Sequence, residues 1–162
     1  MLAAGRLRWP RDNVGRLVRF ADGTAARVFR ETVASQPAHD PCFLAVAFRL
    51  RGVRGRGHEW FEAESILNTP LFAGFPGFTS KLWLAHDGNG IYRGLYEWDG
   101  AERAERYARS LWRVLALGCE HDSIDFRVLP GLRRDSVLAD PALLQSHLAA
   151  EQRAWWRIVA VT

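Results

Sequence analysis

The sequence predicts an α+β fold in which four central strands and two helices follow the order β-α-β-β-α-β. Three observations support this prediction. Apolar runs of strand length alternate with two segments of helical periodicity, a dense turn sequence separates two neighbouring strands, and 162 residues suit one domain with a substantial core. The composition, 48% hydrophobic and 25% charged, is that of an ordinary globular chain.

A β-hairpin is expected near the N-terminus. Residues Val14–Phe20 and Thr24–Val33 are rich in β-formers and flank Asp22 and Gly23, a pair suited to a two-residue turn. The two prolines and the polar residues of 35–41 indicate a linker into the main body. The hairpin and linker are therefore expected to form an N-terminal extension.

The predicted central unit begins with a strand at 42–50, whose continuous apolar run suits burial on both faces. Helical periodicity follows at 57–68 and ends before Pro70. Two strands are then expected at 78–86 and 90–98, because the sequence between them, Asp-Gly-Asn-Gly, is typical of a hairpin turn.

A second helix is predicted from Asp99 to Gly118. Asp99 and Glu102 have the spacing of a capping box, and Glu–Arg pairs four residues apart favour the exposed side of this helix. A fourth strand at 123–129 completes the order of a ferredoxin-like unit. A C-terminal helix is expected from Asp140 to about Arg153, since Pro141 suits the first helical position.

The predicted organisation has three parts: an N-terminal hairpin extension and linker over 1–40, a ferredoxin-like domain over 41–131, and a C-terminal helix and tail over 132–162 packed on the same domain. The apolar stretch at 155–161 would add an edge strand or pack across a neighbouring subunit.

The central hairpin can be divided into two faces, because strand side chains alternate and the turn gives an odd register sum. The predicted aliphatic face carries Phe78, Ser80, Leu82, Leu84, Ile91, Arg93, Leu95 and Glu97, and the predicted aromatic face carries Thr79, Lys81, Trp83, Ala85, Tyr92, Gly94, Tyr96 and Trp98. The aliphatic face suits packing under the two helices. The aromatic face would then be bare in a monomer, which predicts an interface or a ligand site.

The fourth strand adds charge to the aromatic face in this scheme. Ile124, Phe126 and Val128 alternate with Asp125 and Arg127, so the charged pair is expected to point into the aromatic face. Two such sheets facing each other in a homodimer would enclose a cavity with aromatic walls and a few charges. An exposed strand face with an Asp–Arg surface pair is the alternative.

Three stretches of the sequence resemble a known family: FPGFTSKLWL at 75–84, GIYRGLYEW at 90–98 and AERYARSLWRVLALG at 104–118. They are similar to the YdhR-type monooxygenases of the dimeric α/β-barrel superfamily, which also includes the antibiotic-biosynthesis monooxygenases. The likeness spans about residues 42–131, and its most specific elements are Pro76-Gly77-Phe78, Lys81, Trp83, Gly94 and Tyr96. It implies a homodimer whose two sheets form a barrel.

The resemblance implies a small-molecule enzyme, and we expect a cofactor-independent monooxygenase acting on an aromatic or polyketide-like compound. The expected catalytic residues are Tyr96, Lys81, Asp125 and Arg127, and the expected substrate-binding residues are Trp83, Tyr92, Trp98 and Thr79. Lys81 would bind an anion or form a salt bridge at the barrel rim. A non-redox cyclase or isomerase using the same cavity, and a non-catalytic dimeric ligand-binding protein, stay open.

Several classes of function are not favoured by the sequence. No HxH, HExxH, CxxC, P-loop or dinucleotide motif is present, so no metal and no cofactor are expected. The net charge of +4 arises from 22 cations against 18 anions spread along the chain, which argues against nucleic-acid binding. No run approaches the ~20 apolar residues of a membrane span, and with no secretory signal at the N-terminus a cytoplasmic location is predicted.

Overall fold

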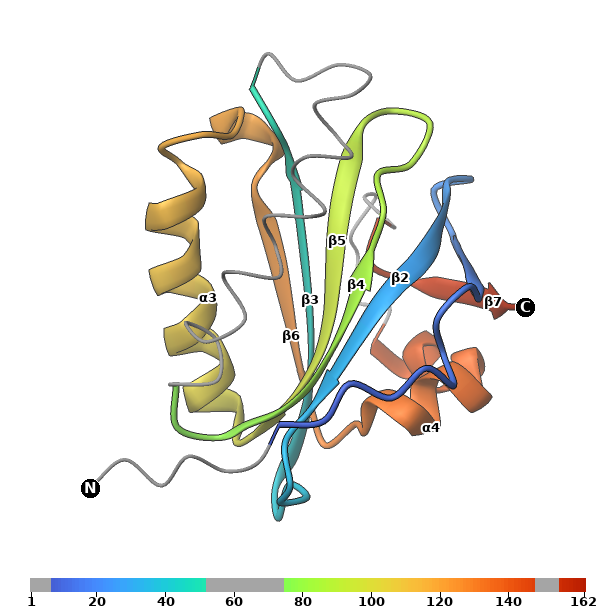
Figure 1. Cartoon of the computed structure of the whole chain (residues 1–162), viewed down its shortest axis with the longest axis vertical. Helices are drawn as coiled ribbons and strands as arrows, with labels where there is room; N and C mark the ends of the chain where they lie inside the picture. The colour runs from blue at the N-terminus through green and yellow to red at the C-terminus, as the bar shows by residue number, and fades with distance from the viewer. Residues whose placement is uncertain (1–6, 52–74, 148–154) are drawn as a thin grey trace.

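The computed structural model describes residues 7–51, 75–147 and 155–162, and has an α+β fold. An antiparallel sheet of seven strands curls around one core, in the order β6-β3-β5-β4-β2-β1-β7 (Figure 1). The strands are β1 Leu17–Phe20, β2 Ala25–Val33, β3 Pro41–Arg49, β4 Phe78–Leu84, β5 Ile91–Asp99, β6 Asp125–Pro130 and β7 Ile158–Val161. The helices are α3 Ala101–Leu115 and α4 Arg134–Ala139, with 3₁₀ turns η1 His121–Ser123 and η2 Pro141–His147. The helix predicted at 57–68 lies outside the described residues.

The predicted N-terminal hairpin is confirmed. β1 pairs with β2, and the turn between them is closed by Asp22, whose Oδ1 accepts hydrogen bonds from the backbone N–H and the hydroxyl of Thr24 at 2.9 and 2.6 Å. Gly23 takes a φ of 87°, which suits glycine. β2 also pairs with β4, so the hairpin is continuous with the central strands.

The predicted register of the central hairpin is also confirmed, with Lys81 opposite Tyr96 and Leu82 opposite Leu95. One prediction is wrong at the start of β4. The register shifts between Phe78 and Ser80, and Phe78 lies opposite Trp98. This irregularity moves the Phe78 ring from the expected aliphatic face to the aromatic face, where the two rings meet edge to face at 5.7 Å.

The aliphatic face forms the main core. Its strand residues pack with the C-terminal segment and with the curled edge of the sheet, and the buried cluster comprises Val18, Phe20, Ala26, Val28, Phe43, Ala45, Leu82, Leu84, Leu95, Leu129, Val137, Leu138, Leu144, Trp156 and Ile158. α4 and β7 lie on this side of the sheet (Figure 1). The described residues of 132–147 and 155–161 therefore supply much of the cover for this face.

The aromatic face is not bare, and the expectation that the helices cover the aliphatic face is wrong for α3. Ala104, Tyr107 and Ala108 of α3 pack in one cluster with Tyr96 and Trp98. Tyr107 makes the difference, because its ring stacks 4.7 Å from that of Trp98 and gives the aromatic face a partner within the same chain. Figure 1 shows α3 on the side of the sheet opposite α4.

The fourth strand faces the other way from the prediction. Arg127 lies opposite Ala45 and Asp125 opposite Ala47, so both share the aliphatic face, while Phe126 and Val128 join the aromatic cluster. The antiparallel partner strand sets this parity, which the sequence of β6 alone does not contain.

The capping box predicted at Asp99 is wrong. α3 begins after Gly100 without a side-chain cap, because Asp99 Oδ1 instead accepts the backbone N–H groups of His39 and Asp40 at 3.0 and 2.8 Å. The predicted Glu102–Arg106 and Glu105–Arg109 pairs are present at 3.0 and 2.6 Å.

The C-terminal region differs in part from the prediction. A short α-helix, α4, precedes the predicted start at Asp140, and the 3₁₀ turn η2 follows it. The predicted helix continued over 148–153, which lie outside the described residues. The open question about 155–161 is answered in favour of an edge strand, because β7 pairs with β1.

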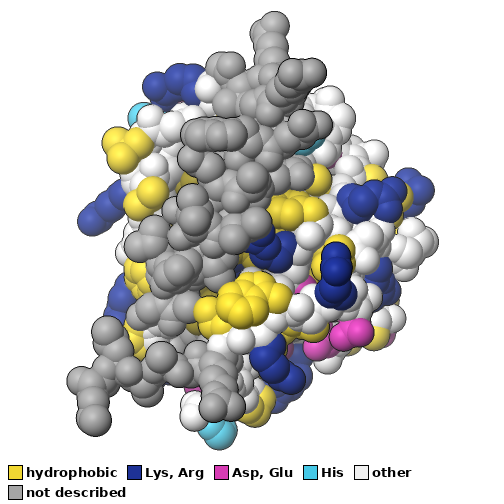
Figure 2. All heavy atoms as spheres, in the orientation of Figure 1, with side chains coloured by type: hydrophobic (Ala, Val, Ile, Leu, Met, Phe, Trp, Pro, Cys, Tyr) yellow, Lys and Arg dark blue, Asp and Glu magenta, His cyan; other side chains and the backbone are white. Residues whose placement is uncertain are grey.

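The described helices are all too short or too polar to cross a membrane. Among the described residues on the face seen in Figure 2, lysine and arginine side chains lie apart from one another, with other side chains between them.

Candidate functional site

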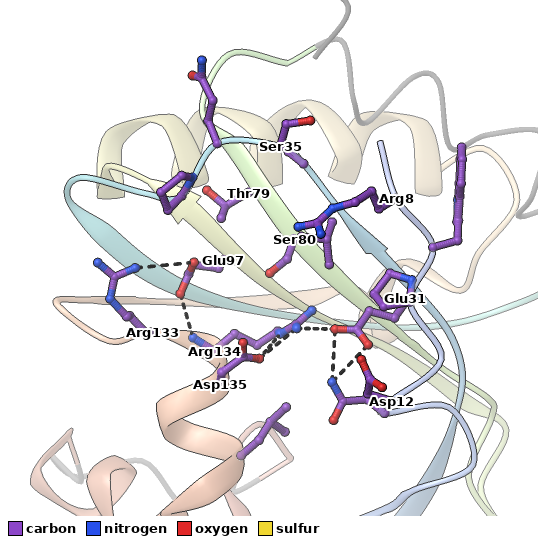
Figure 3. Close-up of a pocket in the computed structure, with 18 of the residues that line it drawn as sticks. Arg8, Asp12, Glu31, Ser35, Thr79, Ser80, Glu97, Arg133, Arg134 and Asp135 are labelled. Atoms are coloured by element: carbon purple, nitrogen blue, oxygen red, sulfur yellow. Dashed lines mark hydrogen bonds and ion pairs between the residues drawn. The ribbon is translucent and has the colours of Figure 1, made fainter. Parts of the chain in front are cut away.

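A hollow of about 930 Å³ opens between the N-terminal segment, the end of β2 with the start of β4, and the start of α4 (Figure 3). Its lining residues are Arg8, Trp9, Pro10, Asp12, Asn13, Arg16, Glu31, Val33, Ala34, Ser35, Gln36, Pro37, Thr79, Ser80, Glu97, Arg133, Arg134, Asp135, Leu138 and Ala139. We call it the Arg134 pocket. Four arginines and four carboxylates line it, so its charge is balanced.

A buried ionic network forms the floor of the pocket. The Arg134 guanidinium donates to Glu31 through Nη2, and both side chains are only 3% exposed. Asn13 Nδ2 donates to both oxygens of Glu31 at 3.1 and 3.0 Å, and Arg16 Nη1 donates to Asn13 at 2.9 Å. Figure 3 shows Arg134, from the start of α4, meeting Glu31, from the sheet.

Arg134 keeps part of its hydrogen-bonding capacity free. Nε and Nη2 donate to Asp135 Oδ1 at 3.1 and 2.8 Å, and Nη2 also serves Glu31. Nη1 is fully buried and has no hydrogen-bond partner within the described residues. Because an unsatisfied buried donor is costly, this nitrogen is suited to an acceptor on a molecule that enters the pocket.

Glu97 forms the second charged wall. Its Oε1 accepts the backbone N–H of Arg134 at 3.1 Å, and its Oε2 lies 4.0 Å from Arg133 Nη1. Burial raises the pKa of Glu97, Asp135 raises it further, and the backbone hydrogen bond with the charges of Arg133 and Arg134 opposes the rise. Protonation of this carboxyl group therefore changes the charge of the pocket at a higher pH than is usual for glutamate.

Local sequence explains why these groups converge. The β6 strand ends at Pro130, and Gly131 takes a φ of 81° that turns the chain back across the sheet. The turn places Arg133 and Arg134 over the aliphatic face, where Ser80 lies directly opposite Glu97. Thr79 and Ser80 are buried and line the pocket, so their hydroxyl groups lie near the space that a bound molecule would occupy.

The arrangement suits recognition of a small molecule that carries an anionic group. A carboxylate oxygen can accept from Arg134 Nη1, and neighbouring hydroxyl groups can complete its hydrogen bonds. No group of three metal-ligating side chains occurs within residues 7–51, 75–147 and 155–162.

The sequence-predicted residues on the aromatic face lie elsewhere. Lys81 is 5% exposed, and its Nζ lies 3.2 Å from the ring centroid of Trp83 and 4.7 Å from that of Tyr96. Burial lowers the pKa of Lys81 well below its usual value, and the charge of Arg30 lowers it further. The structure thus brings Lys81, Trp83 and Tyr96 together as predicted.

The space beside this cluster is small. A cavity of about 30 Å³ is lined by Lys81, Trp83, Tyr92, Tyr96 and neighbouring residues of β2, β3 and β5. This volume holds roughly one water molecule, so it does not hold the polycyclic substrate that the sequence predicts. The packing of Tyr107 on Tyr96 and Trp98 explains part of the difference.

Tyr96 is bonded within the core. Its hydroxyl oxygen lies 3.0 Å from that of Tyr107, and either group can donate. Burial raises the pKa of Tyr96, and the Tyr107 hydrogen bond opposes this rise. Tyr96 therefore stays protonated at neutral pH, which suits a hydrogen-bond donor and not a base.

The other predicted site residues are dispersed. Thr79 lines the Arg134 pocket, and Trp98 is fully buried against α3. Asp125 accepts a hydrogen bond from Trp155 Nε1 at 3.0 Å, and Arg127 lies 5.3 Å from the ring of Trp156. Asp125 and Arg127 thus lie on the opposite face of the sheet from Lys81 and Tyr96, and the predicted catalytic set is divided.

Sequence reasoning missed the Arg134 pocket. The consecutive Arg133 and Arg134 directly after the Pro130-Gly131 turn were the available signal, together with Glu97 on the predicted aliphatic face. A glutamate at an inward position predicts a buried partner, because buried carboxylates are paired. Arg133 and Arg134 are the partners of Glu97, and their position over the sheet depends on the backbone path of residues 131–134.

Comparisons with known proteins identify no family. No family model matches the sequence, and no curated protein matches it. One solved structure, described as that of a major regulator of staphylococcal pathogenesis, is similar at 14% identity and a TM-score of 0.46, over 80% of this chain and 86% of that one. The described residues thus define an α+β protein with a polar pocket beside its central sheet.

Proposed function

We propose that this chain is a small-molecule-binding protein whose Arg134 pocket holds the anionic group of its ligand. The observation that carries the proposal is Arg134, a residue that lines the 930 Å³ hollow and whose buried Nη1 has no hydrogen-bond partner within the described residues. The ligand supplies the missing acceptor. The sequence also allowed a non-catalytic ligand-binding protein, but with its site on the aromatic face; the present proposal places the site in the Arg134 pocket instead.

We further propose that the central strands form a ferredoxin-like unit. The order β6-β3-β5-β4, with α3 joining β5 to β6, supports this assignment.

A homodimer stays a prediction. Because both faces of these strands are packed by residues of the same chain, its interface would lie away from the Tyr96 cluster, and sedimentation would measure it.

Arg134→Lys tests the binding proposal. Lysine retains a positive charge beside Glu31 but lacks the planar guanidinium and its Nη1 donor, so the affinity for a carboxylate ligand should fall by about tenfold or more. The matched control is Arg109→Lys on α3, whose side chain is exposed on the other side of the sheet. Calorimetric titration with a panel of small carboxylates measures both. Equal affinities in the two variants would contradict the proposal.

The pH dependence of binding provides a second prediction. As the pH falls through the raised pKa of Glu97, a negative charge leaves the pocket and the affinity for an anion should increase. Arg133, Arg134 and Asp135 are the charged groups that face Glu97, and Glu97→Gln should remove most of the dependence. Titrations between pH 4 and 8 measure this. An unchanged slope in Glu97→Gln would assign the effect to another group.

A cofactor-independent oxygenase is the second candidate function. Lys81 favours it, because a buried amine with a lowered pKa lies beside Tyr96 and a cavity large enough for dioxygen. A cyclase or isomerase would use the same groups without oxygen. Because the 30 Å³ cavity would have to open to admit a substrate, the test is oxygen uptake with small, easily deprotonated phenols, and uptake that is lost in Lys81→Met would support the oxygenase. If no oxygen is taken up, the oxygenase is contradicted and the binding proposal stands without it.

A further inference from the structure

A second hollow adjoins the Arg134 pocket. It measures about 430 Å³ and is lined by Trp9, Pro10, Arg11, Val14, Phe29, Arg30 and Glu31. Trp9, Pro10 and Glu31 line both hollows, so the two spaces meet along the N-terminal segment. Arg134 lies at one end of the combined groove, and the side chains of Trp9, Pro10 and Phe29 line the other.

Trp9 is the notable residue of this groove. Its side chain is 58% exposed, whereas both tryptophans and both tyrosines of the described strands, Trp83, Trp98, Tyr92 and Tyr96, are buried. The backbone holds the segment in place, since Arg8 exchanges two hydrogen bonds with Val33 at 2.8 and 2.9 Å. An exposed indole on an ordered segment beside a binding pocket offers a flat apolar surface for a ligand.

We infer that the ligand of the Arg134 pocket is an aryl carboxylate, whose carboxylate binds Arg134 and whose flat ring system packs on Trp9. The inference rests on the proposed function of the pocket and adds the chemical class of its ligand. Charge supports it at one end, where Arg134 Nη1 lacks an acceptor within the described residues. Shape supports it at the other, where Trp9, Pro10 and Phe29 provide apolar surface. Six arginines and four carboxylates line the two hollows together, so the groove favours an anion although Glu31 lies in both.

The test compares three probes of similar size: 2-naphthoate, its saturated decahydro analogue, and naphthalene-2-carboxamide. The naphthoate has both the charge and the flat ring, and each of the others lacks one of them. Calorimetric titration of the full chain should give an affinity for 2-naphthoate about fivefold or more above that for either analogue. Trp9→Ala should remove the preference over the saturated carboxylate, and Trp112→Ala, a partly exposed tryptophan on α3, should keep it.

A spectroscopic measurement locates the ring. The indole N–H signal of Trp9, identified by its absence in Trp9→Phe, should shift with 2-naphthoate and much less with the saturated analogue.

The possible outcomes separate the two proposals. If both carboxylates bind equally and lose affinity in Arg134→Lys, the pocket stands and the aryl ligand class is wrong. If neither carboxylate binds, or Arg134→Lys has no effect on either, the proposed function fails as well. If the carboxamide binds as tightly as the naphthoate, the ring is recognised without the charge, and this also overturns the inference.

Discussion

Replacing Arg134 with methionine is expected to lower the free energy of unfolding by about 3–5 kcal/mol. The substitution leaves the Glu31 carboxylate buried with only the Asn13 amide as a donor. An uncompensated buried charge is strongly destabilising, whereas the lost packing is small because methionine retains most of the arginine stem. Urea denaturation at neutral pH measures the change.

A double substitution distinguishes loss of the ion pair from loss of packing. Glu31→Leu combined with Arg134→Met removes both charges, so most of the lost stability should return. Arg106→Met on α3 is the control, because its pair with Glu102 is exposed and such pairs contribute little. A double variant as unstable as Arg134→Met alone would show that the network acts through shape and not through charge.

The separation into an aromatic and an aliphatic face could be predicted from the sequence, because strand periodicity and one turn fix the relative register of β4 and β5. Lys81, Trp83 and Tyr96 duly share a face, and Leu82 lies opposite Leu95. What covers each face depends on contacts that periodicity does not contain. The packing of α3 on the aromatic side follows from Tyr107, which reads in sequence as an ordinary helical residue.

The sequence alone could not predict which face of the sheet the side chains of β6 occupy, nor could it predict the Arg134 pocket, because both depend on contacts between distant parts of the chain. Asp125 and Arg127 belong to the strand that pairs with β3, and a shift by one residue exchanges the faces of every side chain. The pocket combines residues from β2, β5 and the start of α4. Glu31 and Arg134, which pair in it, are 103 positions apart in the sequence. Only the folded topology brings them together.

A second buried pair joins three distant turns. Arg93 donates to Asp87 Oδ2 at 2.7 Å, and both side chains are fully buried. It also donates to Thr24 at 2.9 Å in the β1–β2 turn and to the backbone oxygen of Trp155 at 3.0 Å. Its guanidinium carbon lies 4.2 Å from the ring centroid of Phe20. Arg93 thereby connects the N-terminal hairpin, the β4–β5 turn and the C-terminal strand.

Asp87 should make the stability of the protein sensitive to acid. Burial opposes its ionisation, but the hydrogen bond from Arg93, the backbone N–H groups of Ile91 and Asn89, and the charge of Arg93 outweigh burial and hold the pKa of Asp87 below its usual value. An aspartate whose pKa is depressed by folding contributes stability that is complete above its unfolded pKa of about 3.9 and is lost as the pH falls through the folded value.

Asp87→Asn is therefore expected to destabilise the protein at pH 7 by about 3–5 kcal/mol, because the partly exposed Asp22 at 3.2 Å is then the one carboxylate left to the buried Arg93 within the described residues. The difference from the unsubstituted protein should be smaller at pH 3, because the unfolded chain then takes up a proton at Asp87 more readily than the folded chain, whose Asp87 pKa is lower. Chemical denaturation at the two pH values measures it. Asp122→Asn, in the exposed η1 turn, is the control and should change stability little at either pH. A difference for Asp87→Asn that stays constant with pH would mean that the amide disrupts the turn at 87–90 through its hydrogen bonds, and that the charge of Asp87 contributes nothing.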